Sequence, residues 1–452
     1  MQREATVTAM RVAFLLQSFP AVSETFILRQ VTGLLDLGHD VHVFAQRRPP
    51  QSETIHPEFH SYDLASRTTY LDSEMPIESG YWSMPVWPFS GETWLPGAER
   101  AIPNRARLLQ AVPALRRCLD AAPDLTFEVL DPEQYGPQAL SLESLYHLAS
   151  FLERAPRFDV LHAHFGPVAC GFRFARTVCK APLVVTFHGY DFSQYPRQHG
   201  NGVYRRLFQD ADIVTGISRY AIQRLMQIGC PEEKLRVLHT GVSPTRFPFH
   251  ARRLQRGEPV RILTVGRLVE KKGLGYALRA VADVRRSHSD LRYDIIGEGP
   301  LRLQLENLIR QLDLGSVVTL RGAAGADDVR RSFAEAHLYL LASVTAEDGD
   351  QEGIPVSLME AQSCGLPVLS TLHSGIPELV ADGGSGLLVE ERNVEHLARA
   401  LLQLVQNPQA WPAMGECGRK TVEARFDTAA LNRDLVTIYE QAISRFSSGP
   451  RD

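Results

Sequence analysis

Two glutamates eight residues apart form the densest chemical pattern in the sequence. Glu352 and Glu360 lie in the segment EDGDQEGIPVSLMEAQSC, residues 347–364. Pro355 fits the first turn of a helix, where its missing N–H group is harmless. Glu352 and Gly353 are therefore expected at a helix N-terminus, where free N–H groups and the positive end of the helix dipole bind anions. The alternative is a helix that carries two solvated glutamates.

Three further loops favour the binding site over the solvated helix. Arg267, Lys271 and Lys272 lie in GRLVEKKG, after an expected strand, where basic side chains can pair with phosphate. The segment GEGP, which begins at Gly297, follows another strand, and its glycines let the backbone approach a nucleotide closely. STLHSGIPE, residues 370–378, is a third strand-to-helix loop. Because parallel strands end at one edge of a sheet, these loops are expected to face one cleft.

The elements that position these residues alternate between strands and helices along the whole chain. Such alternation predicts an α/β protein with two doubly wound, Rossmann-like domains that face each other across a cleft. The expected strands are 11–16, 41–45, 159–163, 183–187, 212–216 and 235–238 in the first half, and 261–265, 292–296, 317–320, 338–341, 367–370 and 386–389 in the second.

Changes in amino-acid composition along the chain predict the domain boundaries. The N-terminal domain is predicted over 10–245, with an irregular, proline-containing insertion near 47–156. The C-terminal domain is predicted over 256–425, after a linker rich in Pro, Gly and Arg. Residues 426–452 are expected to form a helix and tail, and this helix can return to the N-terminal domain.

Composition also excludes several classes of protein. The 452 residues carry a net charge of −4, so no overall basic field recruits nucleic acid. None of the six cysteines forms a C-x-x-C pair, and no apolar run reaches the ~18–20 residues of a spanning helix. We therefore expect a cytoplasmic protein, or one in peripheral contact with the inner face of a membrane. An amphipathic, arginine-rich helix around 105–119 is the candidate for that contact.

Two patterns suggest a metal site, and a simpler interpretation is preferred for each. Asp348-Gly-Asp350 has the form of a metal-binding D-x-D, but a solvated acidic loop is the better expectation. His162 and His164 share one face of a strand end, yet no third ligand is evident, so hydrogen bonding in a cleft is expected. No metal and no other cofactor is predicted.

The C-terminal loops together resemble a known family. GRLVEKKG, GEGP, EGIPVSLMEAQSCGLPVLST and SGIPELV, within 260–425, resemble the donor half of the retaining family 4 glycosyltransferases of the GT-B fold. The E-x7-E pair of that family matches Glu352 and Glu360. The N-terminal half matches through FPAVSETFILRQ, DVLHAHF, TFHGYD and GISRY, and SETFI resembles bacterial exopolysaccharide transferases of the colanic acid type.

The resemblance implies an activity. The C-terminal domain would bind a nucleotide-diphosphate sugar, and the N-terminal domain would bind a saccharide acceptor, with a lipid-linked oligosaccharide as first choice. A hexosyl group would be transferred with retention of anomeric configuration. A small soluble aglycone is the alternative acceptor. A nucleotide-sugar epimerase, a non-catalytic binding module and a pyridoxal-phosphate phosphorylase are the alternative functions.

The resemblance also implies roles for single residues. Arg267 and Lys272 would hold the donor diphosphate and stabilise the charge on the leaving group. Glu360 would hydrogen-bond the ribose hydroxyls, and Glu352 would contact the donor sugar. The remaining donor contacts would be Gly297, Arg321, Gly322, Gly353 and Ile354.

His188, in FHGYD, would lie near the reacting sugar and complete the catalytic set.

The N-terminal half departs from the family at one loop. Many relatives have a Gly-Gly loop after the first strand, whereas this chain has Ser18-Phe19-Pro20. Either Ser23 substitutes for its phosphate contact, or the loop serves the acceptor. Ser18, Ser23 and His164 are therefore assigned to the acceptor side.

Overall fold

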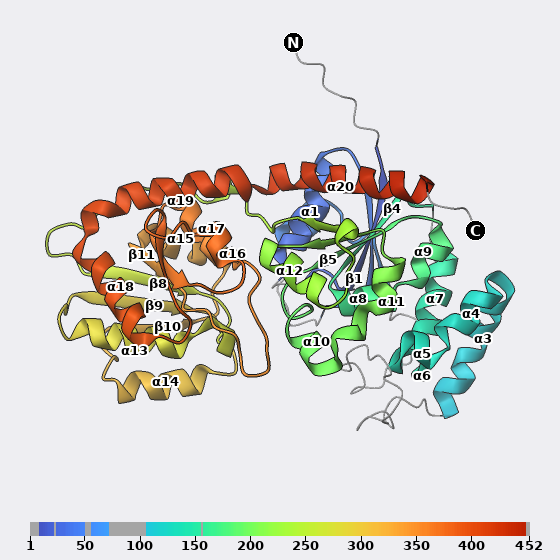
Figure 1. Cartoon of the computed structure of the whole chain (residues 1–452), viewed down its shortest axis with the longest axis horizontal. Helices are drawn as coiled ribbons and strands as arrows, with labels where there is room; N and C mark the ends of the chain where they lie inside the picture. The colour runs from blue at the N-terminus through green and yellow to red at the C-terminus, as the bar shows by residue number, and fades with distance from the viewer. Residues whose placement is uncertain (1–8, 22–23, 50–55, 72–104, 155–156, 449–452) are drawn as a thin grey trace, which may run out of the picture. The chain divides into compact units, whose positions relative to one another are not determined.

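The chain forms two parallel β-sheets, each in its own compact unit (Figure 1). The computed structural model describes residues 9–21, 24–49, 56–71, 105–154 and 157–448. The amino-terminal unit groups Met1–Gly216, Ile222–Val237 and Asn432–Asp452, and the carboxyl-terminal unit groups Ile217–Ala221 and Leu238–Leu431.

The amino-terminal sheet has the strand order β3-β2-β1-β4-β5-β6-β7, and its paired strands are parallel. Its strands are nearly continuous apolar runs, which is typical of a parallel sheet with both faces covered. The strands are β1 (Arg11–Ser18), β2 (Asp40–Arg47), β3 (Thr68–Tyr70), β4 (Val160–His164), β5 (Leu183–Phe187), β6 (Ile213–Gly216) and β7 (Leu235–Val237).

Helices surround this sheet and also fill much of the segment expected to be an irregular insertion. They are α1 (Thr25–Asp36), α2 (Pro57–Ser61), α3 (Arg105–Ala121), α4 (Pro123–Val129), α5 (Pro132–Tyr135), α6 (Pro137–Leu140), α7 (Glu143–Arg154), α8 (Gly166–Gly171), α9 (Phe174–Cys179), α10 (Gln194–His199), α11 (Arg205–Asp210) and α12 (Arg219–Gln227). Within 47–156, residues 105–154 are therefore mostly helical. α3 continues through Pro113 because Ala111, Ala114 and Cys118 are buried, whereas the proline is exposed.

The carboxyl-terminal sheet has the order β10-β9-β8-β11-β12-β13, and its paired strands are again parallel. Its strands are β8 (Val260–Val265), β9 (Leu291–Ile296), β10 (Val318–Gly322), β11 (Leu338–Leu340), β12 (Val368–Thr371) and β13 (Gly386–Val389). Its helices are α13 (Leu274–Arg285), α14 (Arg302–Gln311), α15 (Ala326–Glu335), α16 (Val356–Ser363), α17 (Ile376–Leu379), α18 (Val394–Gln406) and α19 (Trp411–Arg425).

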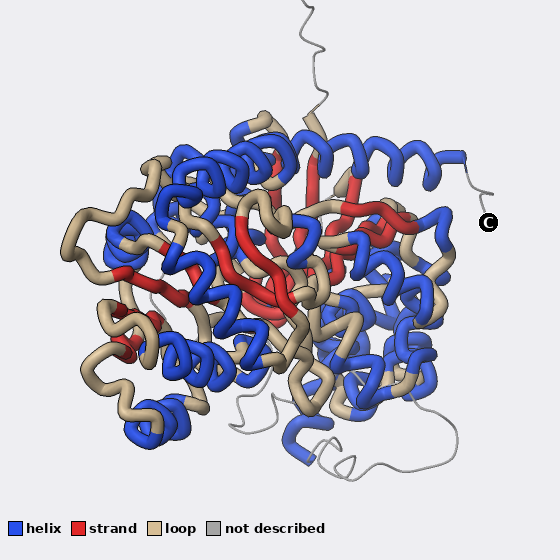
Figure 2. The backbone as a smooth tube through the Cα atoms, turned by 60° about the vertical axis from the view of Figure 1, so that its left-hand side comes forward, coloured by secondary structure: helices blue, strands red, loops and turns tan. Residues whose placement is uncertain are grey.

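Two apolar cores cover the two faces of the carboxyl-terminal sheet. One core contains residues of α13, α14 and α18, and the other contains residues of α15, α16, α17 and α19. Neighbouring residues of β8 enter different cores, Ile262 the first and Leu263 the second, as the two-residue period of a strand requires. Figure 2 shows the strands, in red, with helices on both sides. This confirms the predicted doubly wound α/β class.

The last helix returns to the amino-terminal unit, as expected. α20 (Thr428–Ser448) begins in the carboxyl-terminal unit, and its residues from Asn432 onward belong to the amino-terminal one. The Tyr439 hydroxyl lies 2.7 Å from Nδ1 of His162, and both side chains are fully buried. Asn432 donates a hydrogen bond to the Arg29 carbonyl over 3.3 Å. The long red helix in Figure 1 is this element.

Candidate functional site

The two glycine-containing loops predicted to meet do meet, at the carboxyl ends of β8 and β9. The Gly266 amide donates to the Ile296 carbonyl over 2.9 Å, and the Leu268 amide donates to the Glu298 carbonyl over 2.9 Å. Gly297 has a φ of +144°, and a Cβ there would lie 1.9 Å from the Gly266 carbonyl oxygen. The close backbone contact therefore requires glycine at 297.

Lys272 and Glu352 form a buried ion pair beside these loops. Lys272 Nζ lies 3.0 Å from Oε1 of Glu352, and the two side chains are 13% and 9% exposed. A Cβ on Gly266 would lie 3.2 Å from Cε of Lys272, so the glycine leaves the lysine room. Burial alone would raise the pKa of Glu352, but the Lys272 and Lys271 ammonium groups outweigh it and lower that pKa. Glu352 is thus a carboxylate at neutral pH, with one cation in direct contact.

The acidic loop before α16 is held by the neighbouring lysine. Lys271 Nζ lies 2.9 Å from Oδ2 of Asp350, and the Asp350 amide donates to Oδ1 of Asp348 over 2.9 Å. Asp350 is therefore paired and only partly exposed, unlike the solvated side chain expected from the sequence, whereas Asp348 is exposed. Across the described residues, no group of three or more His, Cys, Asp or Glu side chains is arranged to hold a metal ion.

The other predicted donor residues lie on the same unit. Arg267 is exposed directly after β8, and Glu360 is half-buried on α16, which begins one residue after Pro355. Burial first, with a contribution from the nearby Glu360 carboxylate, raises the pKa of Tyr339 on β11. Glu360 and Tyr339 are thus neighbours on this unit.

Arg321 and Gly322 are at the end of β10. The Gly322 carbonyl accepts a hydrogen bond from the Gly297 amide over 2.8 Å, which joins this strand end to the GEGP loop. The Arg321 guanidinium donates to Oγ of Ser332 over 2.9 Å and lies 3.8 Å from Asp294. The backbone at 321–322 is thus adjacent to the other donor loops, while the Arg321 side chain is engaged with α15 and β9.

His373 and Glu391 belong to the same region, and the sequence did not single them out. His373 is fully buried, and Nδ1 of its ring lies 2.6 Å from Oε1 of Glu391. Nε2 of the ring accepts a hydrogen bond from the Glu352 amide over 3.0 Å. The available signal was a histidine inside the strand-to-helix loop STLHSGIPE, but its partner Glu391 lies after β13 and cannot be found from local spacing.

The amino-terminal unit gathers histidines at the ends of its adjacent strands β4 and β5. Nδ1 of His164 lies 2.9 Å from Nε2 of His188, and the rings of His162 and His164 are 4.3 Å apart. Burial lowers the pKa of His162 and of His188 to about 3, and lowers that of His164 as well. These imidazoles are neutral at physiological pH, so they act as hydrogen-bonding groups rather than as charges.

Asp191, in the FHGYD motif, fixes the turn that carries His188. Its carboxylate accepts hydrogen bonds from the amides of His188, Gly189 and Gly166, over 2.9, 2.8 and 3.2 Å. Burial raises the pKa of Asp191 to about 6, although the hydrogen bonds from these backbone amides lower it. Sequence reasoning quoted the motif but assigned no role to this residue.

Of the two serines predicted for the acceptor side, the structure describes Ser18. Ser18 is the last residue of β1, and β1 pairs with β4, which ends at His164. Ser23 lies outside the described residues. α1 begins at Thr25, with Glu24 as its N-cap residue.

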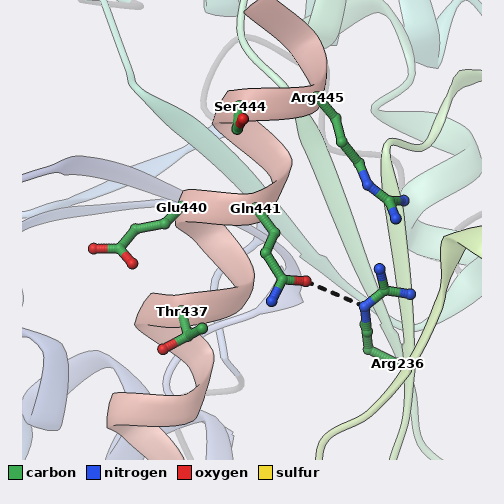
Figure 3. A pocket seen from close by; sticks show the side chains of 6 residues that line it. All are labelled: Arg236, Thr437, Glu440, Gln441, Ser444 and Arg445. Carbon is green, nitrogen blue, oxygen red and sulfur yellow. Dashed lines mark hydrogen bonds between the residues drawn. The ribbon is translucent and has the colours of Figure 1, made fainter. Parts of the chain in front are cut away.

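The amino-terminal unit also has a pocket beside α20. It is lined by Arg236 of β7 and by Thr437, Glu440, Gln441, Ser444 and Arg445 of α20 (Figure 3). Arg236 donates to Oε1 of Gln441 over 3.2 Å, and the guanidinium of Arg445 also points toward this space. None of the predicted site residues lines it.

Comparison with known proteins assigns the chain to a family. Residues 23–241 match the model of the glycosyl transferase 4-like domain, and residues 246–421 match that of the glycosyl transferases group 1. A putative colanic acid biosynthesis glycosyltransferase of Salmonella typhimurium is 33% identical over 435 residues, covering 95% of this chain and 100% of that protein. The chain belongs to the glycosyltransferases, in the same family as this relative.

Other relatives and solved structures agree with this assignment. The amylovoran biosynthesis glycosyltransferase of Erwinia amylovora is 34% identical to this glycosyltransferase over 436 residues, covering 96% of this chain and all of the relative. Among solved structures, Anabaena HepE with UDP has a TM-score of 0.65 at 16% identity, covering 95% and 99% of the two chains. Sucrose-phosphate synthase from Thermosynechococcus elongatus has a TM-score of 0.64 at 17% identity, covering 96% and 99%. The predicted GT-B fold is thereby confirmed.

Among the described residues, no helix is both long and apolar enough to cross a bilayer.

Proposed function

We propose that this glycosyltransferase moves a hexosyl group from a nucleotide-diphosphate sugar to a saccharide acceptor, with retention of anomeric configuration. The acceptor would be a lipid-linked intermediate of exopolysaccharide or cell-surface glycan synthesis. The names of the relatives support this. Two proteins that match 95% or more of this chain are named as glycosyltransferases of colanic acid and amylovoran biosynthesis. Structural neighbours were solved with UDP and with UDP-glucose, which supports a nucleotide-sugar donor.

The ion pair between Lys272 and Glu352 is the observation that carries the proposal. The loop after β8 brings the cation, and the loop between β11 and α16 brings the carboxylate. A diphosphate leaving group needs fixed positive charge, and Lys272 with the exposed Arg267 supplies it. Glu352, charged and buried, can accept hydrogen bonds from sugar hydroxyls. Glu360 would hold the ribose hydroxyls.

The pairing of Glu352 also bears on the mechanism. A carboxylate held 3.0 Å from an ammonium group is a weakened nucleophile, so we propose that Glu352 orients the sugar rather than attacks it. The acceptor hydroxyl would then enter on the face that the diphosphate leaves, and the departing phosphate would help to remove its proton. For His188 we retain the role that the resemblance implies, near the reacting sugar. Its neutral ring can donate or accept one hydrogen bond.

A donor screen tests the proposal. Ligand binding raises apparent stability by mass action, so the melting temperature of the full chain is measured with UDP-glucose, GDP-mannose and other nucleotide sugars. The nucleotide sugar that stabilises the protein is then incubated with it and a saccharide acceptor in EDTA, and NMR follows the anomeric proton of the glycoside formed. We expect turnover in EDTA and a retained configuration. Loss of activity restored by Mn²⁺ or Mg²⁺ would contradict metal independence, and an inverted product would contradict retention.

The same incubation separates the alternatives. Interconversion of the donor sugar without transfer would indicate an epimerase. No release of nucleoside diphosphate above background, with any stabilising sugar, would indicate a binding module and overturn the proposal.

A lipid-linked acceptor suggests where the protein works, and we propose the cytoplasmic face of a membrane. Leu108, Leu109 and Val112 are 50%, 65% and 56% exposed on α3, next to the exposed Arg116. An amphipathic helix of this kind can lie in a lipid interface. Co-sedimentation with vesicles that contain anionic lipid tests this contact. Equal recovery in the supernatant with and without vesicles would contradict it.

A further inference from the structure

The loop that carries Glu352 is fastened to a second loop by two hydrogen bonds. The Glu352 amide donates to Nε2 of His373 over 3.0 Å, and the Gly375 amide donates to the Gly353 carbonyl over 3.2 Å. The two loops also pack without a gap, because a Cβ on Gly375 would lie 2.6 Å from Cγ1 of Ile354. The backbone at 352–353 therefore has its position set by the loop after β12.

The partners of His373 determine its tautomer. A backbone amide can only donate, so Nε2, which faces the Glu352 amide, must carry no proton. The proton of the neutral ring is then on Nδ1, and it is donated to Oε1 of Glu391 over 2.6 Å. A ring with protons on both nitrogens would place two donors against each other. The carboxylate of Glu391 thus selects the tautomer that can hold Glu352.

Glu391 is itself fixed at both oxygens. Oε2 accepts a hydrogen bond from the Thr345 amide over 2.7 Å, at the start of the acidic loop. The other end of that loop reaches the same threonine, because Nε2 of Gln351 donates to Oγ1 of Thr345 over 3.0 Å. One carboxylate, in the loop after β13, therefore ties the loop after β11 to His373.

We propose that His373 and Glu391 are positioning residues for the transferase reaction, which hold the backbone of Glu352 so that its carboxylate stays against Lys272 and the donor sugar. The proposal rests on the role given to Glu352 under the proposed function. Neither side chain touches the donor in this account, since His373 is fully buried and both of its ring nitrogens are engaged within the protein. Their contribution is to keep Glu352 from shifting between binding and transfer.

Two substitutions of His373 separate positioning from simple packing. In His373→Asn, the short amide can reach Glu391 but not the Glu352 amide. In His373→Gln, the longer side chain can place its carbonyl oxygen where Nε2 stood and accept from Glu352. His396→Asn is the matched control, because Nδ1 of His396 likewise lies beside a glutamate, 2.7 Å from Oε2 of Glu390, but on the surface.

We expect His373→Asn to lower kcat by about 10–100-fold, with the Kd for UDP or GDP within about twofold of wild type. His373→Gln should recover most of the loss, and His396→Asn should change neither value. Hydrogen–deuterium exchange of the peptide around 347–358, measured without ligand, should be faster in His373→Asn than in the other two variants. If His373→Asn fails to fold, Glu391→Ala, made at a side chain that is 27% exposed, tests the same link from its other end.

The outcomes are distinguishable. Equal exchange rates and equal kcat in His373→Asn and His373→Gln would overturn the positioning role, even if both were slower than wild type. If Glu352→Gln itself retained full activity, the proposed function of Glu352 would fail instead. Wild-type kcat in both His373→Asn and Glu391→Ala, alongside an inactive Glu352→Gln, would overturn this inference alone.

Discussion

At the scale of single residues, the charge on Glu352 is preserved in a buried place because Lys271 and Lys272 face it. A buried ion pair contributes little net stability against apolar replacements, but removing one partner leaves an uncompensated charge that costs about 3–5 kcal/mol. The pair between Lys272 and Glu352 is thus better explained by the chemistry it allows than by the stability it adds.

The two glutamates of the site should have different effects on product binding. If Glu360 holds the ribose, Glu360→Ala should weaken binding of the nucleoside diphosphate. If Glu352 meets the sugar, Glu352→Gln should leave product affinity unchanged and lower turnover. Calorimetric titration of both variants with UDP and GDP checks this. The same loss of affinity in both variants would refute the separate assignments.

Local motifs predicted the residues of the Lys272–Glu352 pair, but not the distant partner of His373. Lys272, Glu352 and Gly297 could be found from the sequence because each lies in a short strand-to-helix loop with a distinctive composition. The link from His373 to Glu391 could not, since it joins the ends of β12 and β13 and depends on how those strands pair.

At the scale of elements, the predicted strands match those of the structure, because buried parallel strands are continuous apolar runs in the sequence. β3 was missed, since its three residues are half-buried and polar. In α19, Pro412, Gly415 and Gly418 weaken the helical pattern of the sequence. The structure explains Gly415, where a Cβ would lie 2.3 Å from the Gly365 carbonyl oxygen, so close packing of α19 requires it.

The contact between α20 and the amino-terminal sheet should contribute measurably to stability. Tyr439→Phe removes the hydroxyl that pairs with His162 and leaves a buried ring nitrogen without its partner, which costs about 1–3 kcal/mol. Urea unfolding of the full chain measures the loss. Thr437→Ala, at an exposed position of the same helix, is the control and should be nearly neutral. Equal midpoints for Tyr439→Phe and wild type would contradict the importance of this hydrogen bond.

The buried histidine of α7 should make stability depend on pH. Burial, with a smaller effect of Arg47, lowers the pKa of His147 to about 3, whereas in the unfolded chain it is about 6.5. Below pH 6.5 the unfolded chain binds a proton that the native protein does not, so the free energy of unfolding falls as pH falls toward 3.

His147→Leu should remove this contribution. The slope between pH 6 and 4.5 should decrease by about 1.4 kcal/mol per pH unit, the value for one proton. Urea midpoints across that range measure it. An unchanged slope would show that His147 takes up its proton in the native state.

At the scale of the whole molecule, the fold and the family were predictable, and the substrates were not. In both sheets, the loops that carry candidate site residues follow the carboxyl ends of strands. The composition of these loops therefore indicates where a binding site can lie. Solved structures only 16–17% identical share the GT-B fold, so the architecture alone does not name a donor or an acceptor. A few side chains of the binding pocket select the donor and the acceptor, and the sequence does not name either ligand.

Turnover by a Lys272→Ala variant tests the central claim most directly. Fixed cations stabilise the charge that concentrates on the departing diphosphate, and losing one such contact costs about 2.7–4 kcal/mol, or roughly 10²–10³ in kcat. Lys271→Ala is the matched control, because Lys271 is equally buried but pairs with Asp350. We predict a fall of that size in Lys272→Ala and a much smaller one in Lys271→Ala, with both proteins folded. A folded Lys272→Ala protein with kcat near wild type would contradict the account.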